Sequence, residues 1–80
     1  MLYGYAKLRK GDYDGAIAQF DAMISKDMEK ATSYNWRGVA KEKKGDLDGA
    51  IADYRRAIDA NPNLKNELLP KIEKALANKK

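Results

Sequence analysis

An internal repeat constrains this chain more than any other feature of its sequence. When the chain is moved along itself by 34 residues, KGDYDGAIA at residues 10–18 falls on KGDLDGAIA at residues 44–52. Phe20 then falls on Tyr54. A period of this length indicates supersecondary units that stack on one another, because a single unit cannot bury its own apolar face.

Each unit is predicted to consist of two helices joined by a short turn. Gly45 supplies a left-handed residue that ends one helix, and Asp46 can cap the next. Pro62 ends that second helix, since proline cannot continue it. We therefore expect five helices. They are placed at residues 2–10, 14–25, 48–60 and 65–77, with the third running from a cap at Thr32 or Ser33 to Lys44.

The period and the residue types resemble the tetratricopeptide repeat, whose pattern is W-x2-L-G-x2-Y, then A-x3-F, then P. The second repeat matches this pattern at Tyr34, Gly38, Ala50, Tyr54, Ala57 and Pro62. It departs from the pattern at Arg37, which stands in place of leucine, and at Lys41, which stands in place of an aromatic residue. The first repeat is less complete, because Met1 falls inside the pattern.

The resemblance implies an all-α fold, in which antiparallel helix-turn-helix repeats stack as a short right-handed solenoid with a C-terminal capping helix. We expect a single domain over residues 1–80. It would comprise a truncated first repeat at 1–30, a complete second repeat at 31–64 and the capping helix at 65–80.

Four positions leave the local structure open. Gly15 and Gly49 fall in the first turn of a helix, where each costs up to ~1 kcal/mol relative to Ala, and inheritance from one ancestral repeat is the interpretation we favour. Pro70 requires the last helix either to begin at residues 67–69 or to bend at the proline. Trp36 either covers the neighbouring helices or forms part of a binding surface.

Composition excludes several classes of function. The chain has no cysteine and no histidine, so thiolate zinc sites and the commonest general base are ruled out. No phosphate-binding loop or nucleophile with a base is present, and carboxylates such as Asp21 and Asp53 are expected on solvent-facing positions. We therefore expect no enzyme activity, no cofactor and no metal. Without a long apolar run, we also expect no membrane association and a cytoplasmic location.

The net charge of +4 raises the question of nucleic-acid binding. Basic residues gather where helices are predicted to end, at residues 7–10 and 41–44, and Asp12 and Asp46 stand where the next helices begin. Cations at helix C-termini and anions at N-termini complement the helix dipole. Helix-end electrostatics therefore accounts for most of the clustering, and no nucleic-acid partner is expected.

The resemblance implies a protein-interaction scaffold that holds a peptide or partner helix in a concave groove, lined by the first helix of each repeat. A short amphipathic peptide suits the predicted lining better than a purely acidic one. The predicted groove residues are Tyr5, Leu8, Arg9, Thr32, Asn35, Trp36, Val39, Glu42, Asn66, Leu69 and Glu73.

Two alternatives remain open for this face. Leu8 and Val39 could simply pack between neighbouring helices. The chain could also be a natural fragment or an engineered minimal repeat scaffold without a dedicated ligand. Weak self-association is a further expectation, because the late start of the first helix would leave Phe20 and Met23 poorly covered.

Overall fold

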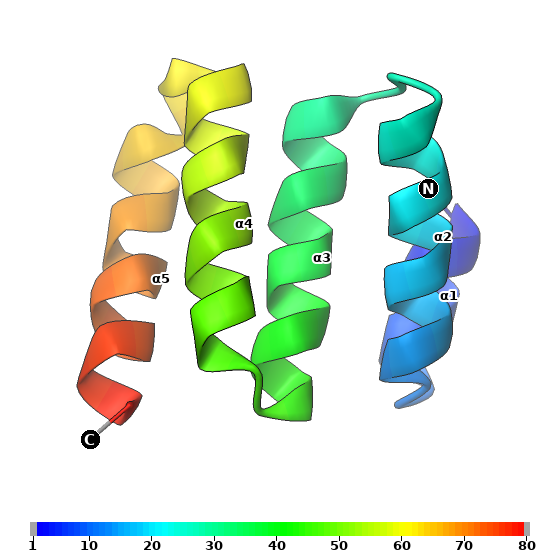
Figure 1. Ribbon diagram of the computed structural model, residues 1–80, viewed down its shortest axis with the longest axis horizontal. Helices are drawn as coiled ribbons and strands as arrows, with labels where there is room; N and C mark the ends of the chain where they lie inside the picture. Colours follow the sequence, from blue (N-terminus) through cyan, green and yellow to red (C-terminus); the bar gives the residue numbers. More distant parts are fainter. Residues whose placement is uncertain (1, 80) are drawn as a thin grey trace.

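The computed structural model describes the backbone of residues 2–79 and the side chains from Ala6 onward. Within these residues there are five α-helices, one short 3-10 helix and no strand, so the predicted all-α fold is confirmed (Figure 1). The elements are α1 (Leu2–Arg9), α2 (Tyr13–Ser25), α3 (Lys30–Lys44), α4 (Leu47–Ala60), η1 (Pro62–Leu64) and α5 (Lys65–Asn78).

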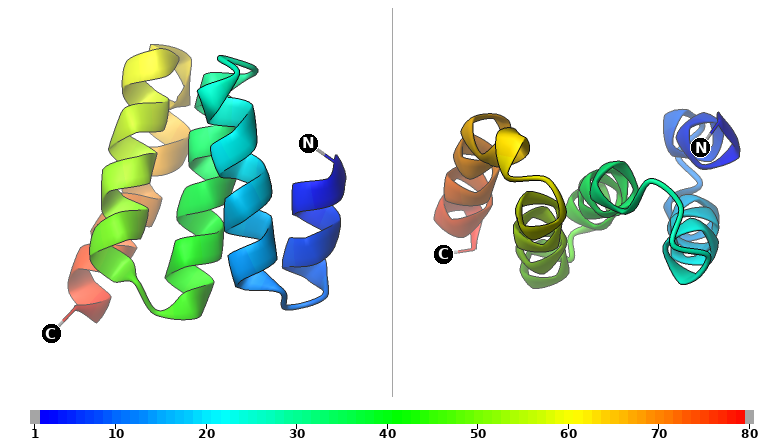
Figure 2. Two further views of the ribbon diagram at one scale, coloured as in Figure 1. Left: turned by 45° about the vertical axis from the view of Figure 1, so that its right-hand side comes forward. Right: turned by 90° about the horizontal axis from the view of Figure 1, so that it is seen from above.

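The helices form two layers. Seen from above, α1, α3 and α5 lie on one side and α2 and α4 on the other, so that the chain alternates between the layers (Figure 2). Each helix packs against the helix that follows it in the sequence. Helix α3 lies deeper than α1 and α5, and the face made by these three helices is therefore concave (Figure 2). None of the helices in the described part of the chain is long and apolar enough to cross a membrane.

The two predicted Gly-Asp turns are confirmed. Gly11 and Gly45 have φ of 85° and 101°. The Gly45 N–H donates to the Glu42 carbonyl at 3.0 Å and the Asp46 N–H to the Lys41 carbonyl at 2.8 Å, which is the hydrogen-bond pair of a Schellman motif. Each following aspartate caps the next helix, since the Asp46 carboxylate accepts from the Gly49 N–H at 3.0 Å.

The two caps explain why glycine stands at positions 15 and 49. A Cβ built at Gly49 would lie 2.3 Å from Oδ2 of Asp46, and the same distance separates a Cβ at Gly15 from Oδ2 of Asp12. A larger residue would therefore displace the capping carboxylate. The glycines thus have a local structural reason that the sequence did not reveal.

The start of α3 differs from the prediction. The helix begins at Lys30, after Glu29 with a φ of 42°, and no side chain caps it. The predicted cap at Thr32 or Ser33 is therefore wrong, since both residues lie within the helix. Ser33 is instead fully buried, and its hydroxyl donates to the Met28 carbonyl at 3.4 Å.

The last helix begins at Lys65, as its predicted range of 65–77 has it, and not at residues 67–69. Pro62 opens the 3-10 helix η1, which the Asn61 side chain caps by accepting from the Asn63 N–H at 3.1 Å. Helix α5 follows directly from Lys65 and continues through Pro70. As a result α5 begins 35 residues after α3, whereas α4 begins 34 residues after α2.

Two apolar clusters hold the layers together. One joins α1, α2 and α3 through Leu8, Ala16, Phe20 and Ala40, and the other joins α4 to α5. Phe20 is fully buried, so the expectation that its side of α2 would be poorly covered is wrong. The second cluster consists of Ala50, Ile51, Tyr54, Ala57, Leu68, Ile72 and Ala75.

Close approach of α3 to α4 depends on a glycine. A Cβ at Gly38 would lie 2.8 Å from Cε1 of Tyr54 and 3.2 Å from the carbonyl oxygen of Ala50. Any larger residue there would push the two helices apart. The contact at Gly38 therefore holds one side of α3 against α4, and the opposite side of α3 forms part of the concave face.

Candidate functional site

The concave face carries two hollows, one on each side of α3. The α1–α3 hollow has a volume of about 380 Å³ and the α3–α5 hollow about 230 Å³. Val39 and Lys43 line both, so the two hollows are adjacent, and we call them together the groove. The other lining residues are Leu8, Arg9, Tyr13 and Trp36 in the first hollow and Glu42, Tyr54, Lys71 and Lys74 in the second.

The α1–α3 hollow is mainly apolar. Leu8 forms part of its floor and belongs to the buried cluster between α1, α2 and α3. Trp36 and Tyr13 are half-buried and pack against the same cluster. The indole therefore covers the preceding helices, as one interpretation of Trp36 predicted, and it also lines the hollow. Its part in a binding surface stays a prediction.

The α3–α5 hollow is polar around a buried phenol. The Tyr54 hydroxyl donates to Oε1 of Glu42 at 2.6 Å, and the Tyr54 side chain is fully buried. Burial, and then the hydrogen bond to Glu42, raise the pKa of Tyr54. The phenol therefore stays a neutral donor at physiological pH. Lys71 lies above its ring, with Nζ 5.7 Å from the ring centre.

The Glu42–Tyr54 pair replaces an apolar pair of the first repeat. At an offset of 34 residues, Glu42 corresponds to Leu8 and Tyr54 to Phe20. Leu8 and Phe20 pack together in the buried cluster between α1, α2 and α3. The donor and its acceptor therefore occur together in one repeat and are both missing from the other, as expected when a buried hydroxyl needs a partner.

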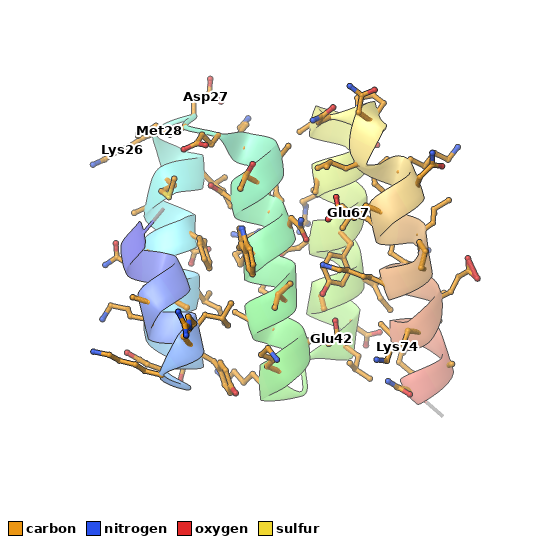
Figure 3. All side chains as sticks on the ribbon, turned by 180° about the vertical axis from the view of Figure 1, so that it is seen from behind. Lys26, Asp27, Met28, Glu42, Glu67 and Lys74 are labelled. Atoms are coloured by element: carbon orange, nitrogen blue, oxygen red, sulfur yellow. The ribbon has the colours of Figure 1, made fainter. Side chains whose placement is uncertain are left out.

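Basic side chains surround the α3–α5 hollow. Lys43, Lys71 and Lys74 line it, and none of them is in an ion pair with another residue of the described part of the chain. Glu42, Glu67 and Lys74 extend into the space between α3 and α5 (Figure 3). Three lysines face one carboxylate, Glu42, in the lining of this hollow, so the lysines dominate its charge.

The predicted groove residues of α1 and α3 fall into three groups. Leu8, Arg9, Trp36, Val39 and Glu42 line the groove. Thr32 lines a different hollow, and Asn35 is half-buried with its Oδ1 buried and without a hydrogen-bond partner. The predicted contribution of Tyr5 falls on a side chain outside the described residues.

The predicted residues of α5 lie elsewhere. Asn66, Leu69 and Glu73 are exposed and line neither hollow. The prediction took each of them as the residue 34 positions after a groove residue of α3. Because α5 begins 35 residues after α3, the equivalent residue in α5 is one position further along the chain. Glu67, Pro70 and Lys74 are the shifted equivalents, and Lys74 does line the groove.

Sequence reasoning therefore missed five residues of the groove. They are Tyr13, Lys43, Tyr54, Lys71 and Lys74. Pro62 was the residue that could have indicated the position of the two lysines of α5. A proline after a helix end starts a connection, and the length of that connection need not follow the 34-residue period.

The hollow that contains Thr32 is larger, at about 760 Å³, and lies between the first turns of α3 and the last turns of α4. Its walls include the exposed side chains of Glu29, Lys30, Arg56 and Asp59. Arg56 is already engaged, since its Nη1 lies 3.0 Å from Oδ1 of Asp53. This hollow therefore offers charged side chains of both signs and no buried apolar floor.

An ion network holds α3 between α2 and α4. Arg37 contacts Oδ1 of Asp21 at 2.6 Å and binds Asp53 with two nitrogens, at 2.8 and 2.7 Å. Lys41 adds a contact to Asp53 at 3.2 Å. Asp53 is fully buried, so its predicted solvent-facing position is wrong, whereas Asp21 is exposed as predicted.

The network explains how a buried carboxylate stays charged. Burial by itself raises the pKa of Asp53. The hydrogen bonds and positive charge of Arg37, followed by those of Lys41, lower the pKa by more than burial raises it, so the pKa of Asp53 is below its ordinary value. The hydrogen bond that Arg37 donates to Asp53 in turn raises the pKa of Arg37. Asp53 is engaged on all sides and lies away from the groove, so its role is structural.

The described residues offer no other chemistry at this surface. Within residues 2–79, no group of three or more acidic side chains is placed to hold a metal ion. What the groove combines is an apolar hollow, a buried phenol hydrogen-bonded to a carboxylate, and lysine side chains. Such a surface can bind a ligand of mixed polarity.

Comparison with known proteins identifies the family. A family model described as tetratricopeptide repeat matches residues 3–64, which is most of the chain. No match was found among curated proteins or among solved structures. Tetratricopeptide repeats generally mediate protein–protein interactions. From the internal period, the two-layered helices and this match, the chain belongs to the tetratricopeptide repeat family.

Proposed function

We propose that this protein binds a peptide or a helix of a partner protein in the groove formed by α1, α3 and α5. One observation carries the proposal: two hollows flank α3 on the concave face, and they share Val39 and Lys43 in their walls. A ligand that crosses α3 would contact both hollows at once.

Rigidity of α3 supports this function. The helix is fixed on one side by the close approach at Gly38 and on the other by the Asp21–Arg37 ion pair. A groove built on fixed helices loses little conformational entropy when a ligand binds. The groove is short, however, so we expect micromolar affinity at best, about −8 kcal/mol or weaker.

The test begins with selection of short peptides from a display library against the whole chain. The chain has no cysteine, so a bulky thiol-reactive label can be attached at one chosen position. A label on Lys43→Cys would occupy the groove, and a label on Arg55→Cys would stand on the exposed side of α4. Both original residues are exposed, so neither change should disturb the fold.

We expect labelled Lys43→Cys to lose binding and labelled Arg55→Cys to keep the affinity of the unmodified chain. The unlabelled Lys43→Cys variant separates the loss of a charge from the steric block. Binding that survives the label at position 43 would place the ligand elsewhere. A selection that enriches no peptide would instead favour a scaffold without a dedicated ligand.

A further inference from the structure

Charge in this protein is divided between its two layers. Helices α1, α3 and α5 together carry ten Lys or Arg residues and three Glu residues. Helices α2 and α4 carry five Asp residues and two Arg residues. The layer that forms the concave face is therefore basic and the layer behind it is acidic. Helix-end electrostatics alone does not produce this division, because Lys71 and Arg37 lie in the middle of their helices.

Part of the basic excess is neutralised by ion pairs between the layers. Lys44 of α3 pairs with Asp14 of α2, and Lys41 of α3 contacts Asp53 of α4 at 3.2 Å. Beyond the end of α5, Lys79 pairs with Asp48 in the same way. These basic residues face the acidic layer and are already satisfied by it.

Three basic residues without such a pair line the groove. Among the described residues, Lys43, Lys71 and Lys74 form no ion pair, and all three line the α3–α5 hollow. Of the three Glu residues of this layer, Glu42 lines the hollow and accepts from Tyr54, whereas Glu67 and Glu73 do not line it. The unpaired lysines therefore leave a positive site with room for an anionic group.

We propose, resting on the groove-binding function above, that the ligand is an acidic segment of a partner protein. An apolar side chain of that segment occupies the α1–α3 hollow, against Leu8 and Trp36. One or two of its carboxylates lie among Lys43, Lys71 and Lys74. The charge of the groove selects the carboxylates and attracts the segment from solution, while the apolar hollow fixes its register.

The position of the hollows sets the spacing within the segment. Two hollows on opposite sides of one helix are separated by roughly a helix diameter, about 10 Å. An extended peptide covers that distance in about three residues, at ~3.3 Å per residue. The apolar residue and the first carboxylate of an extended ligand are therefore about three positions apart in its sequence.

A protein segment fits these observations better than a nucleic acid. A single strand carries one phosphate per nucleotide and needs cations along its whole path. Here three unpaired lysines line the α3–α5 hollow, of which Lys43 alone also lines the adjoining hollow, and the floor of that adjoining hollow is apolar. An oligonucleotide would leave that floor unused.

The experiment uses the display selection described above, with an unbiased library of short peptides and the whole chain as bait. The first readout is the composition of the enriched peptides. Trp36 is the sole tryptophan and lines the α1–α3 hollow, so its fluorescence reports whether that hollow is occupied. The second readout is the affinity of an enriched peptide for charge-reversed variants, together with its dependence on salt.

The charge-reversed variant is Lys43→Glu with Lys74→Glu. Its control is Arg55→Glu with Lys65→Glu, which changes the net charge equally at exposed positions that do not line the groove. We expect affinity to fall about tenfold or more in the first variant and to stay within about twofold in the control. The milder pair Lys43→Gln and Lys74→Gln, measured with helicity as a check on folding, should show a smaller loss.

Each outcome decides the proposal. Enrichment of Asp or Glu about three positions from an apolar residue, with the losses just given, supports it. Neutral or basic peptides that bind in the groove and are indifferent to charge reversal would overturn the acidic ligand and leave the groove-binding function in place. Failure to enrich any peptide would overturn both. Displacement of an enriched peptide by a single-stranded oligonucleotide at equal concentration would assign the groove to nucleic acid instead.

Discussion

At the scale of single residues, the same helix ending is used three times with different residues. Helices α1 and α3 end at Gly11 and Gly45, both in the left-handed region. Helix α2 ends with the same two hydrogen bonds, from the Asp27 N–H to the Ile24 carbonyl and from the Met28 N–H to the Met23 carbonyl, each at 2.9 Å. There the left-handed residue is Asp27, with a φ of 60°, in the link that Figure 3 labels.

Replacing this aspartate should stabilise the fold. An L-residue other than glycine is strained in the left-handed region, so Asp27→Gly should raise the free energy of unfolding by about 0.5–1 kcal/mol. Part of the gain is offset by loss of the exposed ion pair with Lys30, which contributes little. Urea unfolding at constant slope measures the change.

The matched control is Gly45→Ala. A Cβ at Gly45 meets no atom within 4 Å, so any loss of stability there comes from the backbone alone. We expect a loss of about 1 kcal/mol. If Asp27→Gly were neutral while Gly45→Ala was costly, strain at Asp27 would not be the reason for the shape of the α2–α3 link.

At the scale of elements, the contact between α3 and α4 shows how one repeat differs from its copy. The Tyr54 hydroxyl of α4 depends on Glu42 of α3, whereas the first repeat has Phe20 and Leu8 at these places. A buried hydroxyl without a partner costs about 1–3 kcal/mol. A change from Phe to Tyr at the α4 position therefore requires a change from Leu to Glu at the α3 position.

We predict that Glu42→Leu alone lowers the free energy of unfolding by about 1–3 kcal/mol, because it leaves the Tyr54 hydroxyl buried and unpaired. Adding Tyr54→Phe should recover most of that loss by restoring the apolar pair of the first repeat. The double-mutant cycle is measured by thermal or urea unfolding. Additive losses in the double variant would show that the two side chains do not depend on each other.

At the scale of the whole molecule, Arg37 and Asp53 link three helices. Arg37 of α3 binds Asp21 of α2 and Asp53 of α4, so the network joins the two repeats across their interface. Arg37 stands where the family pattern has leucine. A charged interface of this kind makes the stability of the entire fold depend on the ionisation of one buried carboxylate.

This dependence predicts the behaviour in acid. Because the folded-state pKa of Asp53 lies below its unfolded value of about 3.9, its contribution to stability is complete above that pH. The contribution is lost as the pH falls through the folded-state pKa. Asp53→Asn should cost about 3 kcal/mol at pH 7 and remove this part of the pH dependence, as measured by urea unfolding at pH 7 and in acid.

The control is Asp59→Asn on the exposed surface of α4. It should change stability by less than about 0.5 kcal/mol and retain the wild-type loss in acid. An Asp53→Asn variant that lost stability in acid as steeply as the wild type would show that other carboxylates carry the effect.

Weak self-association stays a prediction, and the exposed Leu69 and Leu76 of α5 are the side chains to replace in a sedimentation test.

The sequence by itself determined the repeat, the helices, the Gly-Asp turns and the side of α3 that faces the groove. These features depend on interactions within a few residues, such as the capping of α4 by Asp46, and on helical periodicity, which places Val39 and Glu42 on one face. Only the tertiary structure decided the rest. The 3-10 helix after Pro62 moves α5 by one residue and brings Lys71 and Lys74 into the groove. Which carboxylates are buried and which lysines remain unpaired depends on the residue that lies opposite on a neighbouring helix, and no local pattern along the chain contains that information.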